Sequence, residues 1–430
     1  MQHIAIIGNG IAGITAARYV RKLNGNCQIT VISAETNHFF ARTALMYIYM
    51  GHLTYAQTKP YEDNFWQKNR IDLLNGYVKY INTNANTLYL SDNRQLNYHK
   101  LLIATGSKPN FGNWSGHNLP GVQGLYSYQD LELLEKNTNP TPQHAVIVGG
   151  GLIGIELAEM LHSRGIQLSL LVREANYWGN ILPPQESEIV AQQIQQRGIR
   201  LKLNTQLAAI NPNATTGRVG SVTTTNNETI FCDFVGLTAG VQPNIGFLQD
   251  SNIATDKGVL VNHYLNTNIP NIFAAGDCAQ FIEPLPNRNA IEQVWYTGLR
   301  QGATAAYNLC GYNLPYQPRL WFNSAKFFDL EYQIYGKISA NPNSQTEQQL
   351  FWQHATKPIC LRLAIIPQTQ ILIGISSIGM RLNHDVCEQW ITDKRNLLQI
   401  LPLLHEANFN PEFYANYYPD IVKKWQVLLQ

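Results

Sequence analysis

The sequence has few charged residues and little excess of either sign. Lys and Arg total 31 and Asp and Glu total 29 among 430 residues, so the net charge is +2. Such a balance creates no strong positive field, which argues against a nucleic acid partner. No apolar run approaches the roughly 20 residues that span a bilayer, and the first residues already read as a strand. We therefore expect no transmembrane segment, no signal peptide and a cytoplasmic protein.

Cysteine is scarce and scattered. No two cysteines have C-x-x-C spacing, and no Cys/His cluster with the spacing of metal ligands occurs. We therefore predict no metal site. Isolated thiols are typical of buried or incidental cysteines in a reducing compartment. The six residues are Cys27, Cys232, Cys278, Cys310, Cys360 and Cys387.

The first residues carry a glycine pattern between a strand and a helix. An apolar run at Ile4–Ile7 leads into Gly8, Gly10 and Gly13, and a helical pattern follows at Ile14–Leu23. In G-x-G-x-x-G, the first glycine allows a tight turn and the second lets the backbone approach a pyrophosphate. The third lets helix and strand pack closely. The helix N-terminus then faces the phosphates, so this segment predicts a dinucleotide site.

An acidic residue supports that prediction. A second apolar run, Gln28–Ile32, is followed by Glu35, which lies 27 residues after Gly8 (35 − 8). This is near the spacing at which a carboxylate takes a ribose hydroxyl. A later buried strand ends in a glycine turn at Ala104, Thr105 and Gly106.

The glycine pattern occurs a second time. A strand beginning at Ala145 runs into Gly149, Gly151 and Gly154, which lie 141 residues after the first set (149 − 8). This predicts a second dinucleotide-binding unit rather than a short repeat. A further apolar strand runs into Gly276 and Asp277.

The pattern predicts an α/β protein. We expect two Rossmann-like three-layer domains and a C-terminal α+β domain, in which strands lie near Leu330–Tyr335, Ile359–Ile366 and Ile371–Ile375. The expected boundaries are 1–115 and 242–315 for the first domain, 116–241 for the second, and 316–430 for the third.

With these motifs in order, the chain resembles the flavin-dependent pyridine nucleotide–disulfide oxidoreductase superfamily. The resemblance covers roughly residues 1–340. The stretch Ile29–Leu45 is most similar to the ferredoxin reductase, rubredoxin reductase and apoptosis-inducing-factor branch, because Phe40, Arg42 and Leu45 form an aromatic-x-Arg-x-x-Leu pattern.

The resemblance implies that FAD lies on the first unit. Gly8, Gly10 and Gly13 would face its pyrophosphate, and Glu35 its adenosine ribose. Arg42 would lie near the flavin or its phosphates, although a solvated surface arginine is the alternative. Asp277 would accept a hydrogen bond from the ribityl chain. The FAD set that this resemblance implies also includes Ala104, Thr105, Gly106 and Gly276.

The second unit would bind NAD(P)H through Gly149, Gly151 and Gly154. Glu156 matches the family glutamate that reaches the nicotinamide end, with a plain helix-surface glutamate as the alternative. The acid expected at the end of the second strand falls on Val172. Arg173, the next residue, would suit the 2′-phosphate of NADPH, whereas a shifted alignment would let Glu174 bind an NADH ribose.

The absence of cysteine near the expected flavin position limits the redox chemistry that we expect. Disulfide reductases of this superfamily carry cysteines beside the flavin, but Phe40–Gly51 contains none, and the single-cysteine position of other branches falls on Thr43. A thiol relay needs sulfur at the flavin. We therefore expect hydride to pass from NAD(P)H to FAD, and electrons to pass on to an external acceptor. No catalytic acid or base is assigned.

Three alternatives for the protein's role remain open. The acceptor is a small electron-transfer protein, as in the resembled branch, or a quinone, as in type II NADH dehydrogenases. The third alternative is a flavin-loaded, non-catalytic binding protein. A quinone acceptor would suit peripheral membrane association through an aromatic helix in Pro411–Gln430, which otherwise packs on its own domain or on a homodimer partner. Its candidate membrane residues are Phe413, Tyr414, Tyr417, Tyr418, Ile421, Val422, Lys423, Lys424 and Trp425.

Overall fold

The computed structural model describes residues 1–286, 288–409, 412 and 415–428. The chain divides into two compact units, each built from three segments. The first unit contains residues 1–112, 123–141 and 237–318, and the second contains 113–122, 142–236 and 319–430. The three-domain boundaries given above stay a prediction.

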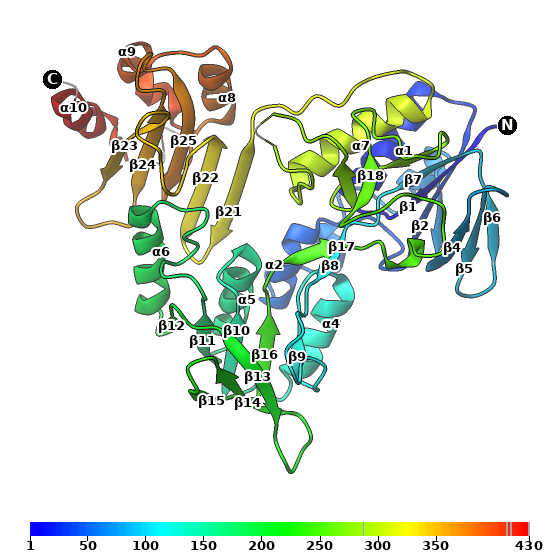
Figure 1. Cartoon of the computed structure of the whole chain (residues 1–430), viewed down its shortest axis with the longest axis horizontal. Coiled ribbons are helices and arrows are strands. Elements are labelled where there is room, and N and C mark those ends of the chain that lie inside the picture. Colours follow the sequence, from blue (N-terminus) through cyan, green and yellow to red (C-terminus); the bar gives the residue numbers. More distant parts are fainter. Residues whose placement is uncertain (287, 410–411, 413–414, 429–430) are drawn as a thin grey trace. The chain divides into compact units, whose positions relative to one another are not determined.

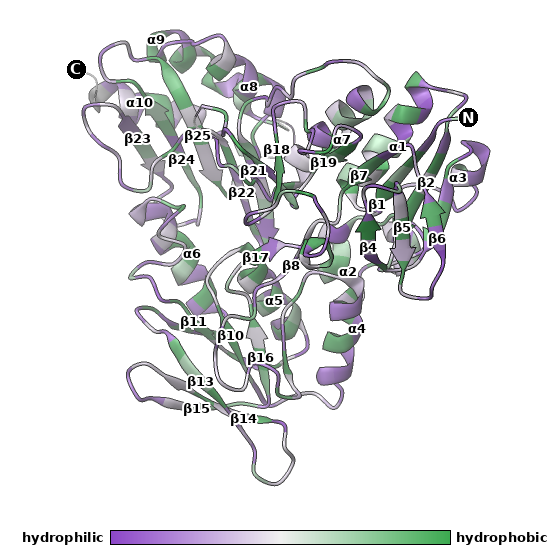
Figure 2. Cartoon of the chain, turned by 45° about the vertical axis from the view of Figure 1, so that its right-hand side comes forward, coloured by the Kyte–Doolittle hydropathy of each residue, from purple (hydrophilic) through white to green (hydrophobic). Residues whose placement is uncertain are grey.

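A five-stranded parallel sheet forms the centre of the first unit. Its order is β19-β7-β1-β2-β3, and β1 lies between β2 and β7. The central strand β1 is apolar and buried over its whole length, as expected for a sheet covered on both faces, whereas the edge strand β3 is exposed at both ends. Figure 2 shows apolar colour along β1 and β7. The strands are β1 (His3–Ile7), β2 (Gln28–Ser33), β3 (Asp72–Asn75), β7 (Lys100–Ile103) and β19 (Ile272–Ala274).

Helix α1 (Ile11–Leu23) follows β1 and packs along α7 (Trp295–Leu309), as Figure 1 shows in blue and yellow. Their close approach depends on glycine, because a Cβ at Gly302 would lie 2.3 Å from the Ala12 carbonyl oxygen. The sequence predicted a helix over Ile14–Leu23, and the observed helix begins about one turn earlier, at Ile11. The unit's other helices are α2 (Leu45–Tyr49), α3 (Phe65–Lys68), α4 (Tyr128–Asn137) and the 3-10 helices η1 (Arg42–Ala44), η2 (Tyr55–Thr58) and η3 (Gly246–Leu248).

Small sheets complete the first unit. An antiparallel sheet has the order β4-β5-β6, β8 pairs with β17, and β18 pairs with β20. These strands are β4 (Val78–Asn82), β5 (Thr87–Leu90), β6 (Gln95–Asn97), β8 (Ser107–Pro109), β17 (Val241–Pro243), β18 (Val259–Val261) and β20 (Ala279–Phe281).

The second unit contains another five-stranded sheet, of order β12-β11-β10-β16-β9, and a three-stranded sheet, β13-β14-β15. Its strands β10, β11 and β12 pair in parallel, with the glycine-started helix α5 following β10. The elements are β9 (Val122–Gln123), β10 (His144–Val148), α5 (Leu152–Ser163), β11 (Gln167–Leu171), α6 (Pro184–Gln196), β12 (Arg200–Lys202), β13 (Leu207–Pro212), β14 (Val219–Thr224), β15 (Thr229–Phe231) and β16 (Phe234–Leu237).

The C-terminal part of the second unit is an antiparallel sheet with helices, of order β21-β22-β25-β24-β23. The three expected strands are present, and two edge strands, β21 and β23, are additional. The elements are β21 (Phe322–Phe327), β22 (Leu330–Gly336), β23 (Gln348–Gln353), β24 (Cys360–Ile365), β25 (Leu372–Ile378), α8 (His384–Thr392), α9 (Leu397–Ile400), the 3-10 helix η4 (Leu401–Ala407) and α10 (Tyr418–Leu428).

Helix α10 packs on its own domain. Tyr418, Ile421 and Trp425 are buried, and the Trp352 indole N–H donates to Asp420 Oδ2 at 2.9 Å. This favours the packed alternative over a helix that presents these side chains to lipid. Phe413 and Tyr414 lie outside the described residues. Among the residues that the structure describes, no helix has the length and apolar character needed to cross a membrane.

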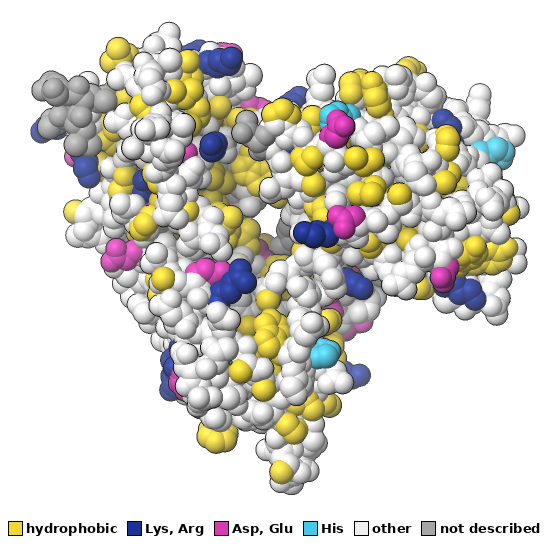
Figure 3. Space-filling model, in the orientation of Figure 1, with side chains coloured by type: hydrophobic (Ala, Val, Ile, Leu, Met, Phe, Trp, Pro, Cys, Tyr) yellow, Lys and Arg dark blue, Asp and Glu magenta, His cyan; other side chains and the backbone are white. Residues whose placement is uncertain are grey.

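Charge is dispersed over the surface. Positive and negative side chains lie close together at several places on the face shown in Figure 3, without a broad area of one sign. This agrees with the net charge of +2.

Candidate functional site

The loop after β1 has the geometry of a phosphate cradle. Gly8 has a φ of +110°, and a Cβ there would lie 2.1 Å from the Ala104 carbonyl oxygen. A Cβ at Gly13 would lie 2.0 Å from the Gly8 carbonyl oxygen. At Gly10, by contrast, a Cβ would meet nothing within 4 Å. Gly10 caps α1 without a side chain, so the helix N-terminus faces open space that fits a pyrophosphate.

Glu35, just past β2, is held by Arg42. The guanidinium donates two hydrogen bonds, from NH2 to Glu35 Oε2 at 2.6 Å and from NH1 to Oε1 at 2.7 Å. Glu35 Oε1 also accepts from the Tyr128 backbone N–H at 2.9 Å. An ionised carboxylate accepts about four hydrogen bonds. One acceptor position on Oε2 therefore remains for a ribose hydroxyl.

Arg42 is partly buried, with 29% of its side chain exposed, rather than a fully solvated surface arginine. Its guanidinium lies 4.5 Å from the centre of the Tyr126 ring and donates to the Tyr126 carbonyl oxygen at 2.8 Å. Burial disfavours its charge, but attraction and hydrogen bonds to Glu35 outweigh burial and raise the pKa of Arg42. The fixed cation is suited to a site for negatively charged phosphates.

Asp277 lies in a hydrogen-bonded cluster at the ends of β7 and β19. Its Oδ2 accepts from Ser107 Oγ and from Tyr126 OH, each at 3.2 Å. Gln293 Nε2 donates to Ser107 Oγ at 2.9 Å. Burial raises the pKa of Asp277, and the bonds from Ser107 and Tyr126 oppose that rise.

The Ala104–Gly106 turn adjoins this cluster. Thr105 Oγ1 donates to the Asn244 carbonyl oxygen at 2.8 Å, and a Cβ at Gly106 would lie 2.9 Å from Tyr126 OH. The Gly276 N–H donates to Gln301 Oε1 on α7 at 2.7 Å. Sequence reasoning missed Ser107, Tyr126 and Gln293. Tyr126 and Asp277 are 151 residues apart, and no local pattern marks either partner for the other.

The loop after β10 repeats the cradle in the second unit. Gly149 has a φ of +119°, and a Cβ at Gly151 would meet nothing within 4 Å. Gly151 caps α5 as Gly10 caps α1. Gly154 is buried on α5. The clearance at this helix N-terminus is the same as that at Gly10.

The residues after β11 differ in exposure. Val172 is fully buried, and a Cβ at Gly150 would lie 2.9 Å from its Cγ2 atom. The Arg173 side chain is 71% exposed, and its Nε lies 2.7 Å from Glu174 Oε1. Asn180 Nδ2 also donates to Glu174 Oε1, at 3.1 Å. An exposed guanidinium and a tethered carboxylate therefore lie side by side where the adenosine ribose is expected.

Glu156 lies on α5, two residues after Gly154. Burial and the charge of Glu159 raise the pKa of its carboxyl to about 7. At neutral pH the group can therefore be either a proton donor or a carboxylate.

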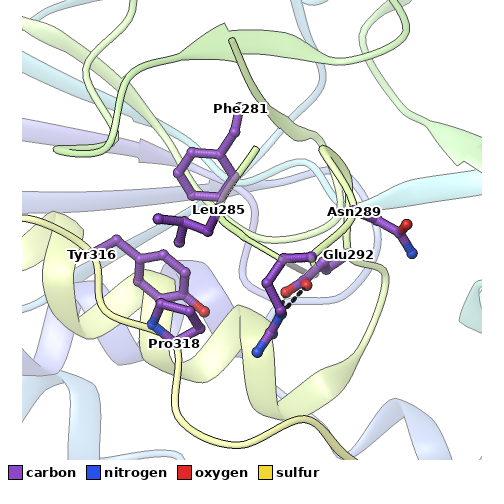
Figure 4. A pocket seen from close by; sticks show the side chains of 7 residues that line it. Phe281, Leu285, Asn289, Glu292, Tyr316 and Pro318 are labelled. Atoms are coloured by element: carbon purple, nitrogen blue, oxygen red, sulfur yellow. Dashed lines mark hydrogen bonds and ion pairs between the residues drawn. The ribbon is translucent and has the colours of Figure 1, made fainter. Parts of the chain in front are cut away.

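A small pocket lies beside the start of α7 in the first unit (Figure 4). It has no enclosed space for a water-sized molecule. Its floor is the Arg288–Glu292 ion pair. The pocket is too small for a dinucleotide. The lining residues are Phe281, Leu285, Arg288, Asn289, Glu292, Tyr316 and Pro318.

Within the described ranges, no three His, Cys, Asp or Glu side chains are grouped so that they could hold a metal ion. Thr43, at the single-cysteine position, is exposed on η1. The cysteines are all free, and all but Cys310 are buried.

Residues 2–302 match the family model described as pyridine nucleotide-disulphide oxidoreductase. A rubredoxin–NAD(+) reductase of Acinetobacter baylyi is 30% identical over 287 residues, which are 65% of this chain and 72% of that protein. An assimilatory nitrate reductase electron transfer subunit of Bacillus subtilis is 26% identical over 312 residues, which are 72% of this chain and 39% of that protein.

Solved structures give the same fold. An NAD-dependent persulfide reductase from A. fulgidus has a TM-score of 0.85 at 20% identity, and the match covers 100% of this chain and 83% of that chain. The expected fold class, two Rossmann-like domains and a C-terminal α+β domain, is confirmed.

Proposed function

Because this chain belongs to the pyridine nucleotide-disulphide oxidoreductase family and is an FAD-dependent NAD(P)H oxidoreductase, we propose that it passes electrons to a small electron-transfer protein. FAD supplies the redox chemistry, since it accepts a hydride and can release electrons singly. The chain's own residues bind and orient the two dinucleotides. The names of the relatives, a reductase and an electron transfer subunit, support catalysis over the alternative of non-catalytic binding.

One observation carries the proposal for the acceptor. Phe40–Gly51 contains no cysteine, so the chain offers no thiol there to receive electrons or to attack a sulfur substrate. The relative from A. baylyi is named for rubredoxin and that from B. subtilis for electron transfer. Both names support an external redox protein as the acceptor.

The FAD site would use the first cradle. Gly10 leaves room for the pyrophosphate, Glu35 offers its remaining acceptor position to the adenosine ribose, and Arg42 supplies positive charge. Asp277 would accept a ribityl hydroxyl in addition to its hydrogen bonds from Ser107 and Tyr126, because both of these go to Oδ2. The remaining FAD-site residues, Ala104, Thr105, Gly106 and Gly276, would shape the backbone beside it.

For the donor, NADPH is favoured. Val172 offers no carboxylate to a ribose hydroxyl, and Arg173 presents an exposed guanidinium beside it. A guanidinium binds a phosphate bidentately. Glu174 is held through Oε1 by Arg173 and Asn180, and an NADH ribose would have to use its Oε2.

Anaerobic stopped-flow mixing of the FAD-loaded protein with NADPH or NADH tests the donor step. We expect oxidised-flavin absorbance to fall faster with NADPH. Steady-state assays with a rubredoxin, a [2Fe–2S] ferredoxin and ubiquinone then test the acceptor. Faster turnover with ubiquinone than with either protein would overturn the acceptor proposal.

Location and assembly also remain proposals. The free thiols support a cytoplasmic protein. A homodimer through residues 316–430 is tested by analytical ultracentrifugation over a range of concentrations, with a truncation before Tyr418 as the comparison.

A further inference from the structure

The turn of the β21–β22 hairpin is fastened to the helices of the nucleotide-binding part of the same unit. The Phe328 backbone N–H donates to Glu159 Oε2 on α5 at 2.6 Å. Arg197, just after α6, places its guanidinium 4.6 Å from the centre of the Phe328 ring. Its NH2 also lies 2.9 Å from Asp329 Oδ2. Figure 1 shows the hairpin reaching α5 and α6.

These contacts hold Glu159 in one position. Phe328 is buried although its backbone has a φ of +50°, a conformation that a bulky residue seldom adopts. The left-handed residue directs its N–H toward the helix rather than along the hairpin. The C-terminal sheet thus supplies a backbone donor to one particular carboxylate of α5.

Glu159 follows Glu156 by three residues on α5, and side chains at this spacing are neighbours on a helix surface. Glu156 is partly buried, and it makes no hydrogen bond or ion pair with any other residue in the described part of the chain. One carboxyl of the pair is therefore anchored and the other is free to meet a ligand.

The charges around the pair are few. Among the residues that the structure describes, Glu159 is the one charged group that shifts the pKa of Glu156. Burial, the largest influence, and Asp329 raise the pKa of Glu159, and the Phe328 N–H, Arg197 and Lys326 oppose that rise. The hairpin supplies the Phe328 N–H and Lys326, and the end of α6 supplies Arg197; these three groups favour a negative charge on Glu159. That charge in turn disfavours a second negative charge on Glu156.

We propose that Glu159, held by the turn of the C-terminal hairpin, is a positioning residue that keeps the Glu156 carboxyl protonated where the nicotinamide binds. A protonated carboxyl offers one O–H donor and one acceptor, which match the carbonyl oxygen and the amino group of the nicotinamide carboxamide. A carboxylate would accept only. The inference rests on the proposed function, because it places the nicotinamide beside Glu156.

The consequence is a pH-dependent donor site. The pKa of Glu156 is raised to about 7 by burial and by Glu159. Below that pH the carboxyl can both donate to and accept from the carboxamide, and above it the O–H donor is lost. The C-terminal sheet, which would lie toward the acceptor, thereby influences the binding of the electron donor.

The test is the titration of Glu156 in the FAD-loaded protein without nucleotide, read from its protonated-carboxyl infrared band. Glu156→Gln identifies the band by removing it. Glu159→Gln keeps an acceptor for the Phe328 N–H but removes the charge. We expect it to move the Glu156 titration to lower pH by about one unit. The pH dependence of KM for NADPH should move in the same direction.

The exposed Glu188→Gln, on α6, is the matched control and should move neither readout. An unchanged Glu156 titration in Glu159→Gln would overturn the proposal. If that variant fails to fold, Arg197→Gln replaces it, with a smaller shift in the same direction expected and no shift overturning the proposal. Because the band is read without nucleotide, failure of the wild type to oxidise NAD(P)H would contradict only the proposed function.

Discussion

Arg362 on β24 and Glu186 on α6 form a buried, bidentate ion pair. Arg362 Nε and NH2 each lie 2.6 Å from a Glu186 carboxylate oxygen, and the two side chains are 5% and 1% exposed. Gln349 and Gln185 each accept a further guanidinium hydrogen bond at 2.8 Å. The pair joins the C-terminal sheet to the nucleotide-binding part of the same unit.

Breaking this pair should be costly. Arg362→Ala would leave Glu186 buried and unpaired, so we expect a loss of about 3–5 kcal/mol in the free energy of unfolding. Arg381→Ala, which breaks the exposed pair with Glu331, should cost about 0–1 kcal/mol. Urea titrations of both variants check this. Equal losses in the free energy of unfolding would show that the buried Arg362–Glu186 pair is no more costly to break than the Arg381–Glu331 pair.

Two glycines of the first cradle should behave differently. Gly8→Ala places a Cβ against the Ala104 carbonyl, so we expect a less stable apoprotein. Gly10→Ala has room in the protein itself but would meet a bound pyrophosphate. We therefore expect an unchanged apoprotein melting temperature and at least about a tenfold weaker FAD affinity, equivalent to ~1.4 kcal/mol. An unchanged FAD affinity in Gly10→Ala would show that this loop does not contact the FAD pyrophosphate.

Nucleotide preference should depend on Arg173. Arg173→Gln removes the exposed guanidinium, and we expect KM for NADPH to rise about 10-fold, the loss of a charge-assisted hydrogen bond. KM for NADH should stay within about twofold. Arg200→Gln, at the exposed start of β12, is the control. A parallel rise for both nucleotides would assign Arg173 a role other than 2′-phosphate binding.

His3 should make stability sensitive to acid. Burial lowers its pKa from 6.5, and its Nε2 lies 2.9 Å from Thr30 Oγ1. The unfolded chain then binds a proton more readily than the folded one. The contribution of neutral His3 to the free energy of unfolding is therefore complete above about pH 6.5. It is lost as the pH falls from there through the lower pKa of the folded state.

Urea midpoints measured between pH 8 and pH 5 test this prediction. The midpoint of His3→Gln should fall less steeply with decreasing pH than that of the wild type. The exposed His117→Gln should follow the wild type. Identical slopes for all three proteins would assign the acid sensitivity to other groups.

The features that sequence predicted are those that a few neighbouring residues determine. The run at Ile4–Ile7 and the glycines after it specify strand, turn and helix start locally, and β1 ends at Ile7 as expected. Edge strands β21 and β23 escaped prediction, because a strand with one neighbour tolerates polar residues such as Asn323 and Gln348.

The supporting contacts of the candidate site were not predictable in this way. Arg362 and Glu186 are 176 residues apart, and Tyr126 reaches Asp277 only because strands distant in sequence end at the same edge. Such pairs follow from the tertiary arrangement rather than from any periodic pattern. Arg42 was foreseen as a candidate, but its bidentate hold on Glu35 was not.

The segmented first unit sets the order in which the chain can fold. Strand β19 pairs with β7 across 171 residues (272 − 101), and residues 142–236, which belong to the second unit, lie between them. During synthesis, one edge of β7 therefore stays unpaired until the ribosome has made residues 142–236 and then β19. Any ribosome pause before Ile272 prolongs the exposure of this apolar edge, when aggregation or chaperone capture competes with folding.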